Sequence, residues 1–383
     1  MKFEWQTKKI GDVVDIRRGS SPRPIHKFLA TEGMPWVKIA DATSDTSRYI
    51  WKTNEFIIED GVTKSVKVAP ETLIVSNSAT PGLPKIMKTT ACVHDGWLVF
   101  SNYRGITRDF LYYKFIDIRR TLVNQANGSV FQNLKTDIVK DFDIRIPCIE
   151  TQKKIVGILS QIDEKIELNN AINNNLEQQA QAIYQQMFVD NPSPEWKEGT
   201  LSDIADITMG QSPSGSSYNE ESNGTIFFQG RAEFGFRFPT VRLFTTEPKR
   251  MACANDILMS VRAPVGDLNV AHTDCCIGRG LAAIHSKTNH QSFVLYTMFS
   301  LKKQLDVFNG EGTVFGSINR NSLNEMPILI PSDEKLDEFE GIVAPMDTAI
   351  RNNYDEICRL EQIRDSLLPK LMSGELDVSD IDL

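Results

Sequence analysis

Ile144-Arg145-Ile146-Pro147 and Ile328-Leu329-Ile330-Pro331 are two copies of one short pattern, and they lie 184 residues apart. Further matches occur at the same offset of 184: Gly128-Ser129-Val130-Phe131 with Gly312-Thr313-Val314-Phe315, and Leu111-Tyr112 with Leu295-Tyr296. Nearer the start of the chain the offset is 191: Glu4-Trp5 matches Glu195-Trp196, and Gly19, Ser21 and Pro22 match Gly210, Ser212 and Pro213. A constant register over so many positions indicates an internal duplication, so we expect one fold to be present twice.

Each copy contains two segments with different sequence patterns. Residues 1–147 and 191–331 mix short apolar, partly β-branched runs, such as Leu73-Ile74-Val75 and Ile257-Leu258-Met259, with turns rich in Gly, Pro, Ser and Asn. These patterns predict compact mixed α/β domains. Each domain is expected to close on a strand that ends in proline and then to pass into a helix.

The two expected helices carry a heptad pattern, in which the spacings between seam positions alternate between four and three. The apolar seam residues are Ile155, Leu159, Ile162, Ile166, Leu176 and Ile183 in the first helix, and Phe339, Val343, Met346, Ile350, Ile357, Leu360 and Leu367 in the second. A sustained spacing of this kind is typical of a coiled coil. The alternative is that each helix packs only on its own domain.

The predicted fold class is therefore α+β, with two mixed α/β domains related by a pseudo-two-fold axis and joined by two long antiparallel coiled-coil helices. The expected boundaries are 1–147 for the first domain, 148–190 for the first helix with its linker, 191–331 for the second domain, 332–373 for the second helix and 374–383 for an acidic tail. The linker Asn191-Pro192-Ser193-Pro194 is short, so the second domain should sit at the far end of the first helix, which about 38 residues would make about 57 Å long.

Composition excludes several classes of protein. None of the apolar runs in the 383 residues approaches the roughly 18 that a membrane span needs, and the first residues lack the apolar core of a signal peptide. The six cysteines include no Cys-x-x-Cys pair, so we expect reduced thiols in a cytoplasmic protein. No phosphate-binding loop, zinc-protease motif or other catalytic constellation is found, and we therefore expect neither an enzyme nor a metal site.

The net charge of −8 is unevenly distributed. Residues 1–147 carry 22 basic and 16 acidic side chains, whereas residues 332–383 carry 5 and 14. Two similar domains held a fixed distance apart suit duplex DNA, whose phosphates attract the basic domain and whose base edges accept polar side chains. The candidate DNA-binding residues are Arg17, Arg18, Ser20, Ser21, Arg23, Lys27, Ser76, Asn77 and Ser78 in the first domain, and Gln211, Ser212, Ser214, Ser217, Tyr218, Arg231, Arg237 and Arg262 in the second. For any one of them, the alternative is a turn residue that bonds its own backbone.

The whole chain resembles the specificity subunit of type I restriction-modification enzymes, in which target-recognition domains and helices alternate. The segments that carry the resemblance are 128–134, Ile144-x-Ile146-Pro147-x-x-Glu150-x-Gln152-x-x-Ile155, 256–267, Ile277-Gly278-Arg279-Gly280 and 367–376. The resemblance implies a non-catalytic subunit that reads a bipartite, asymmetric DNA site. It also implies two modification (methyltransferase) subunits, which hold S-adenosylmethionine, and motor-nuclease restriction subunits as partners. One departure is Leu336, which stands where the first copy has Gln152.

Two alternatives remain open at this point. One is a self-contained DNA methyltransferase with a fused recognition region, which the absence of a glycine-rich cofactor loop disfavours. The other is a coiled-coil scaffold whose end domains bind protein or glycan, which the nearly neutral second domain would suit.

Overall fold

The computed structural model describes residues 5–43, 47–126, 133–310, 316–379 and 381. The chain forms two compact units, Met1–Asn170 together with Tyr354–Leu383, and Ala171–Asn353. Each unit therefore contains one α/β domain and a segment of each of two long helices. The matched segments 128–131 and 312–315 lie outside the described residues.

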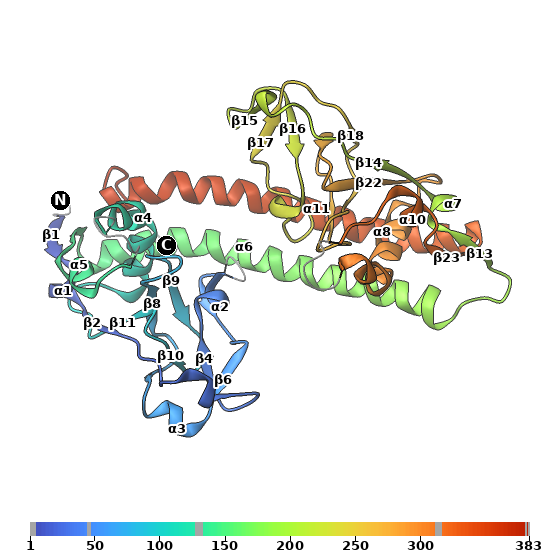
Figure 1. The fold of residues 1–383 in the computed structure, drawn as a ribbon. Helices are drawn as coiled ribbons and strands as arrows, with labels where there is room; N and C mark the ends of the chain where they lie inside the picture. The colour runs from blue at the N-terminus through green and yellow to red at the C-terminus, as the bar shows by residue number, and fades with distance from the viewer. Residues whose placement is uncertain (1–4, 44–46, 127–132, 311–315, 380, 382–383) are drawn as a thin grey trace. The chain divides into compact units, whose positions relative to one another are not determined.

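The α/β domain of the first unit contains two five-stranded sheets and a two-stranded pair (Figure 1). The strand orders are β2-β11-β8-β9-β5 and β3-β6-β4-β10-β7, and β1 pairs with β12. The strands are Gln6–Lys9 (β1), Asp15–Arg18 (β2), Leu29–Ala30 (β3), Met34–Val37 (β4), Tyr49–Ile50 (β5), Glu55–Ile57 (β6), Val66–Val68 (β7), Leu73–Ser76 (β8), Pro84–Met87 (β9), Ala91–Val93 (β10), Trp97–Ser101 (β11) and Asp143–Ile146 (β12). Both sheets are mixed, because β4 and β10 run parallel, as do β5 and β9.

Short helices connect these strands, and one longer helix covers a sheet. They are Ile10–Val13 (α1), Ile25–Lys27 (η1), Ile39–Thr43 (α2), Glu59–Val62 (α3), Arg108–Ala126 (α4) and Thr136–Asp141 (α5). Phe110 and Phe115 of α4 are fully buried in one cluster with Leu73 and Phe100, and the rings of Phe100 and Phe115 are 5.1 Å apart. All four residues of β8 are buried because this strand lies in the middle of its sheet, which explains the apolar run Leu73-Ile74-Val75.

The α/β domain of the second unit repeats this topology, except that no described strand corresponds to β5. Its sheets have the orders β14-β22-β19-β20 and β15-β17-β16-β21-β18, and β13 pairs with β23. The elements are Lys197–Thr200 (β13), Leu201–Ile204 (α7), Ala205–Met209 (β14), Gly215–Ser217 (η3), Tyr218–Asn219 (β15), Thr225–Phe228 (β16), Arg231–Glu233 (η4), Leu243–Thr245 (β17), Met251–Ala252 (β18), Ile257–Ser260 (β19), Leu268–Val270 (β20), Cys275–Ile277 (β21), Leu281–Ser286 (β22), Gln291–Ser300 (α8), Lys302–Leu305 (α9), Asp306–Asn309 (η5), Arg320–Asn324 (α10) and Pro327–Ile330 (β23). The duplication expected from the sequence is therefore present in the order of the strands.

A glycine at the same place in both domains allows two loops to touch. A Cβ atom on Gly19 would lie 2.1 Å from the carbonyl oxygen of His94, and one on Gly210 would lie 2.2 Å from that of Gly278. No side chain fits at such distances, so both Gly-x-Ser-Pro turns need glycine for a close approach. The contact fixes each turn against the loop that follows β10 or β21.

Both long helices begin at matched positions. The first is Ile149–Tyr184 (α6), which continues as a π-helical turn over Gln185–Asp190, and the second is Asp333–Ser373 (α11). Gln152 in α6 is fully buried and bonds the backbone at Gly105, Thr107 and Pro147. Its counterpart Leu336 in α11 is buried as an apolar side chain. The second copy thus has a buried apolar side chain, Leu336, where the first copy has a buried polar side chain that bonds the backbone, Gln152.

Contacts between α6 and α11 occur within each unit. In the first unit Arg364 donates to Asp163 at 3.2 Å and Asn169 to Glu356 at 2.8 Å; in the second, Asn353 donates to Asn173 at 2.8 Å.

All thirteen apolar seam residues predicted from the sequence are buried or half-buried. Ile155 and Leu159 also belong to the core of the first α/β domain, so the start of α6 packs on its own domain as well.

Membrane-spanning helices and clusters of metal ligands are both absent from the part of the chain that the structure describes. None of its helices is both long and apolar enough to cross a membrane. Within the same residues, no group of three His, Cys, Asp or Glu side chains is placed to hold a metal ion.

Candidate nucleic-acid interface

The Gly-x-Ser-Pro turn of the first domain is organised around Asp95, which the sequence-based set of DNA-binding residues did not include. Ser21 donates its hydroxyl to Asp95 Oδ1 at 2.6 Å, and Arg23 donates to Oδ2 at 3.1 Å. Arg18 donates its Nε–H to the backbone carbonyl of Asp95 at 2.7 Å. Three of the predicted residues therefore converge on one acidic side chain in the loop between β10 and β11.

The charges at this turn stay accessible to solvent. The hydrogen bond from Ser21 and the nearby guanidinium of Arg23 hold the pKa of Asp95 below its ordinary value, so its carboxylate stays ionised. The side chains of Arg18 and Arg23 are 57% and 76% exposed. Both cations therefore reach the surface, where a phosphate can approach them while they stay beside Asp95.

Further basic side chains surround the same turn. Arg17 donates to the backbone carbonyl of Lys67 at 3.2 Å, and Ser20 donates to that of Lys64 at 3.1 Å. Lys27, Lys64 and Lys67 are themselves exposed. This part of the first domain is consequently a basic surface of the kind that phosphates attract.

Two other predicted residues of the first domain lie beneath the surface. Ser76 is fully buried and accepts the backbone N–H of Leu83 at 3.0 Å. Asn77 is 4% exposed and donates to the backbone carbonyl of Asp95 at 3.1 Å. Asn77 thereby holds the loop that contains Asp95, whereas Ser76 holds the segment that leads to Leu83. Both positions differ from the surface position expected from the sequence, and Ser78 is half-buried.

In the second domain the matched turn lines a hollow of about 480 Å³. Its lining residues are Gly210, Gln211, Ser212, Pro213, Gly215, Tyr218, Gln229 and Arg279. Tyr218 is held in place because its hydroxyl donates to the carbonyl of Pro213 at 3.1 Å and its ring lies 4.8 Å from that of Phe227. Three of the residues predicted for this loop, Gln211, Ser212 and Tyr218, line the hollow together.

Gln229 and Arg279 complete this hollow, and the sequence-based set missed both. Arg279 lies in Ile277-Gly278-Arg279-Gly280, one of the segments that carry the family resemblance, and that segment could have pointed to it. Gln229, next to the strand β16, carried no comparable signal.

The other predicted residues of the second domain have varied surroundings. Ser217 is 6% exposed and bonds Ser214 and Thr245, so it holds the turn together. Ser214 and Arg262 are exposed. Arg231 is paired with Asp267, and its side chain remains 49% exposed.

Arg237 is buried, contrary to its expected place at a DNA-facing surface. Only 4% of its side chain is exposed, and its guanidinium donates to Asp347 and Glu177, each at 2.9 Å, and to the hydroxyl of Tyr296 at 3.2 Å. Burial opposes its charge, but Tyr296, Asp347 and Glu177 outweigh that effect and raise its pKa. Arg237 therefore anchors the second α/β domain to the segments of α6 and α11 in its own unit.

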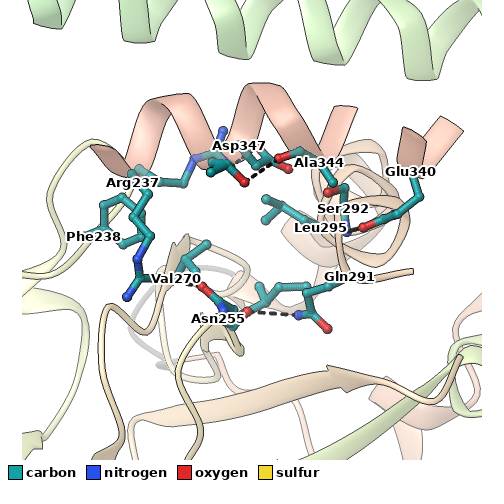
Figure 2. A pocket seen from close by; sticks show the side chains of 13 residues that line it. Arg237, Phe238, Asn255, Val270, Gln291, Ser292, Leu295, Glu340, Ala344 and Asp347 are labelled. Carbon is teal, nitrogen blue, oxygen red and sulfur yellow. Dashed lines mark hydrogen bonds and ion pairs between the residues drawn. The ribbon is translucent and has the colours of Figure 1, made fainter. Parts of the chain in front are cut away.

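A cavity of about 250 Å³ adjoins this anchor. Figure 2 shows side chains that line it, with Arg237 and Asp347 among them. Glu340 of α11 lies at its edge and accepts the backbone N–H groups of Ser292 and Phe293 at 3.1 and 3.3 Å, at the start of α8. Burial raises the pKa of Glu340. The carboxylate satisfies amides that have no partner inside their own helix, and it thereby joins α8 to α11.

The first unit contains a similar buried arginine. Arg48 is 8% exposed and donates to Glu164 of α6 at 3.0 Å and to the hydroxyl of Tyr113 at 3.4 Å; Tyr113 in turn donates to Asp163 at 2.6 Å. Asp163 and Asp347 are equivalent at the offset of 184. Each domain is thus joined to a long helix by a buried arginine, a tyrosine and an aspartate.

The chain thus has the structure of a recognition protein in which one domain fold is present twice, with polar and cationic loops at matched places. The family pattern of type I restriction modification DNA specificity domains matches residues 2–178 and 194–356. The chain belongs to this family, and it carries the domain twice. It is accordingly a DNA-specificity subunit of a type I restriction-modification system and not itself an enzyme. This assignment confirms the expectation drawn from the sequence. It does not favour the alternative of a protein- or glycan-binding scaffold.

Individual relatives agree with this assignment. The chain is 31% identical over 279 residues to a Methanocaldococcus jannaschii protein named as the MjaX type I restriction enzyme specificity subunit, a match that covers 68% of this chain and 64% of that one. It is 24% identical over 409 residues to the MjaIX type I restriction enzyme specificity subunit of the same organism, covering 99% and 95% of the two chains. The crystal structure of the type I restriction-modification system S subunit from M. genitalium shares the fold, with a TM-score of 0.61, 16% identity and coverage of 97% and 96%.

Proposed function

We propose that each α/β domain reads one half of a bipartite, asymmetric site in duplex DNA, the first through residues 1–147 and the second through residues 191–331. The observation that carries the proposal is the matched pair of Gly-x-Ser-Pro turns. In the first domain the turn gathers Arg18 and Arg23 around Asp95, whereas in the second it contributes Gln211 to a hollow that Arg279 also lines. Two domains that share a fold and carry different side chains at their matched turns are suited to recognising different half-sites.

The proposed DNA-facing set takes the predicted residues that have exposed or half-buried side chains. It consists of Arg17, Arg18, Ser20, Ser21, Arg23, Lys27 and Ser78 in the first domain, and Gln211, Ser212, Ser214, Tyr218, Arg231 and Arg262 in the second. The buried residues Ser76, Asn77, Ser217 and Arg237 hold these loops and domains in place instead.

The two helical segments, 148–190 and 332–373, act in this proposal as the spacer between the half-sites. We infer that they pair as an antiparallel coiled coil and that the two halves are related by a pseudo-two-fold axis. In support, contacts that come later in α6 involve residues that come earlier in α11. Asp163 bonds Arg364 in the first unit, and the ring of Tyr184 lies 5.9 Å from that of Phe339 in the second. The acidic tail, 374–383, follows the second helix.

Modification (methyltransferase) and restriction subunits are the proposed protein partners, and they would dock on the helical segments. Apolar side chains there remain exposed, including Leu168 and Ile363 in the first unit and Ile172 and Ile342 in the second. Exposed apolar groups on otherwise charged helices are typical of surfaces that bind a protein partner. The modification subunits would hold the S-adenosylmethionine, and the complex would act on DNA in the cytoplasm.

Exchange of one domain tests the proposal. Residues 1–147 are replaced by the equivalent domain of a relative that recognises another sequence, and the complex with modification subunits methylates a library of duplexes. The proposal predicts that one half of the methylated motif changes while the other half and the spacing stay the same. Exchange of residues 191–331 is the matched control and should change only the other half.

A chimaera of the first kind that altered both halves would contradict the assignment of one half-site to each domain. A chimaera that left the motif unchanged would contradict the assignment of DNA reading to residues 1–147.

A further inference from the structure

The two domains carry opposite charges at one equivalent position. Asp95 follows β10 in the first domain, and Arg279 follows β21 in the second, at the offset of 184. The backbone N–H of Asp95 donates to the hydroxyl of Ser21 at 3.4 Å, and that of Arg279 donates to the hydroxyl of Ser212 at 3.2 Å. Because both amides meet the serine of the Gly-x-Ser-Pro turn, the two side chains start from the same place in the fold.

In the first domain the side chain at this position is used internally. The carboxylate of Asp95 accepts from Ser21 and Arg23, and its side chain is 39% exposed. The acid therefore fixes the direction of Arg23, whose own side chain is 76% exposed. Asp95 positions a cation at the surface and presents little free acceptor to a ligand.

In the second domain the side chain at this position has no such partner. Arg279 is exposed, and its guanidinium makes no hydrogen bond or ion pair with any residue that the structure describes. Gln211, Gln229 and Tyr218 are among the residues that line the hollow beside it. None of the eight lining residues is acidic, so the planar fork of five N–H donors is available to an outside ligand.

The chemistry of this hollow matches the edge of a base. Arginine bonds guanine O6 and N7 through two parallel hydrogen bonds, and glutamine bonds adenine N6 and N7 in the same way. Gly210 and Gly215 line the hollow without side chains, so a base edge can approach the backbone closely.

We propose that Arg279 is a specificity-determining residue that reads a guanine in the half-site of the second domain, with Gln211 and Gln229 reading the adjoining base pair. This inference rests on the proposed function, and it assigns to the second domain the residues that carry sequence preference. In the first domain Asp95 is the equivalent positioning residue, which acts through Arg23.

The test uses the full chain assembled with modification subunits and a library of methylatable duplexes. We expect Arg279→Ala to reduce discrimination at one base pair of the second half-site by about 5- to 150-fold, the value of a good bidentate contact. Arg279→Lys keeps the charge but loses the planar fork, so it should show a similar loss. Lys303→Ala, which removes an exposed cation from the same domain, is the matched control and should leave the motif unchanged.

Several outcomes would overturn the inference. A phosphate contact would weaken binding to all sequences alike and reduce the salt dependence by about one ion, with the motif unchanged. Full discrimination in both Arg279 variants would exclude any role in reading. If the wild-type complex itself failed to select a bipartite motif, the proposed function would fail first, and the two failures are thereby distinguished. Asp95→Ala should relax only the first half-site, and a change in the second half-site would contradict the positioning role.

Discussion

Replacing Asp347 with alanine is expected to lower the free energy of unfolding of the second unit by about 3 kcal/mol, because it leaves the buried guanidinium of Arg237 with only part of its counter-charge. Arg237 bonds Asp347 and Glu177 at equal distances, and its side chain is 4% exposed. The loss should appear as a lower denaturation midpoint and as faster hydrogen exchange in α8, since Tyr296 of that helix donates to Asp347 at 2.9 Å.

The matched control lies on the same helix. Glu338 pairs with Lys335 near the start of α11, and both side chains are about half exposed. Glu338→Ala should therefore cost less than about 1 kcal/mol. Equal effects of Asp347→Ala and Glu338→Ala would show that the buried arginine does not hold the domain on the helix.

A combined variant separates packing from charge. Arg237→Met together with Asp347→Leu removes the cation and one of its anions, and it should be less destabilising than Asp347→Ala alone, because no guanidinium remains buried without its partner. If the double variant were the less stable of the two, the shape of the site rather than its charge balance would be the source of stability.

Lengthening both long helices by four residues at facing positions is expected to lengthen the spacer of the recognised motif by one or two base pairs. Asn173 and Asn353 face each other, with Asn353 Nδ2 2.8 Å from Asn173 Oδ1, and they mark a suitable place. Four helical residues add about 6 Å and rotate the following residues by about 40°. One base pair adds about 3.4 Å and about 34°, so both the shift and the rotation correspond to one or two steps of the DNA helix.

The control for this change is an insertion of four residues in the connection 191–194, outside both helices. It should leave the spacer unchanged, because the second domain is anchored to the helices through Arg237. An unchanged spacer after the helix insertions would show that the helices do not set the distance between the half-sites.

The repeat could be predicted from the sequence because the copies keep a constant offset over long stretches, 191 near the start of each copy and 184 after that. β12 and β23 stand 184 residues apart, as do the starts of α6 and α11, and each follows the offset seen in the sequence. The anchoring arginines escaped detection because they lie where the register shifts from 191 to 184: Arg48 and Arg237 are 189 apart. With no fixed offset to relate the two arginines, the sequence predicts a surface position for Arg237.

The candidate site was predicted in part for a similar reason. The Gly-x-Ser-Pro turns were visible as a motif, and the residues directly after them, such as Ser21 and Ser212, do lie at the two loops. Burial of Ser76 and Asn77 could not be inferred, because their neighbours Asp95 and Leu83 come from other segments of the chain. Tertiary contacts of this kind also brought Gln229 and Arg279 into the hollow.

The most direct test of the account is the methylation motif of cells that carry this chain with its modification subunits, compared with cells that lack the chain. Two α/β domains that share a fold but carry different side chains should produce one motif with two different half-sites, which are separated by a fixed number of unspecified base pairs. A motif without a gap, or the same motif in cells that lack the chain, would contradict the account.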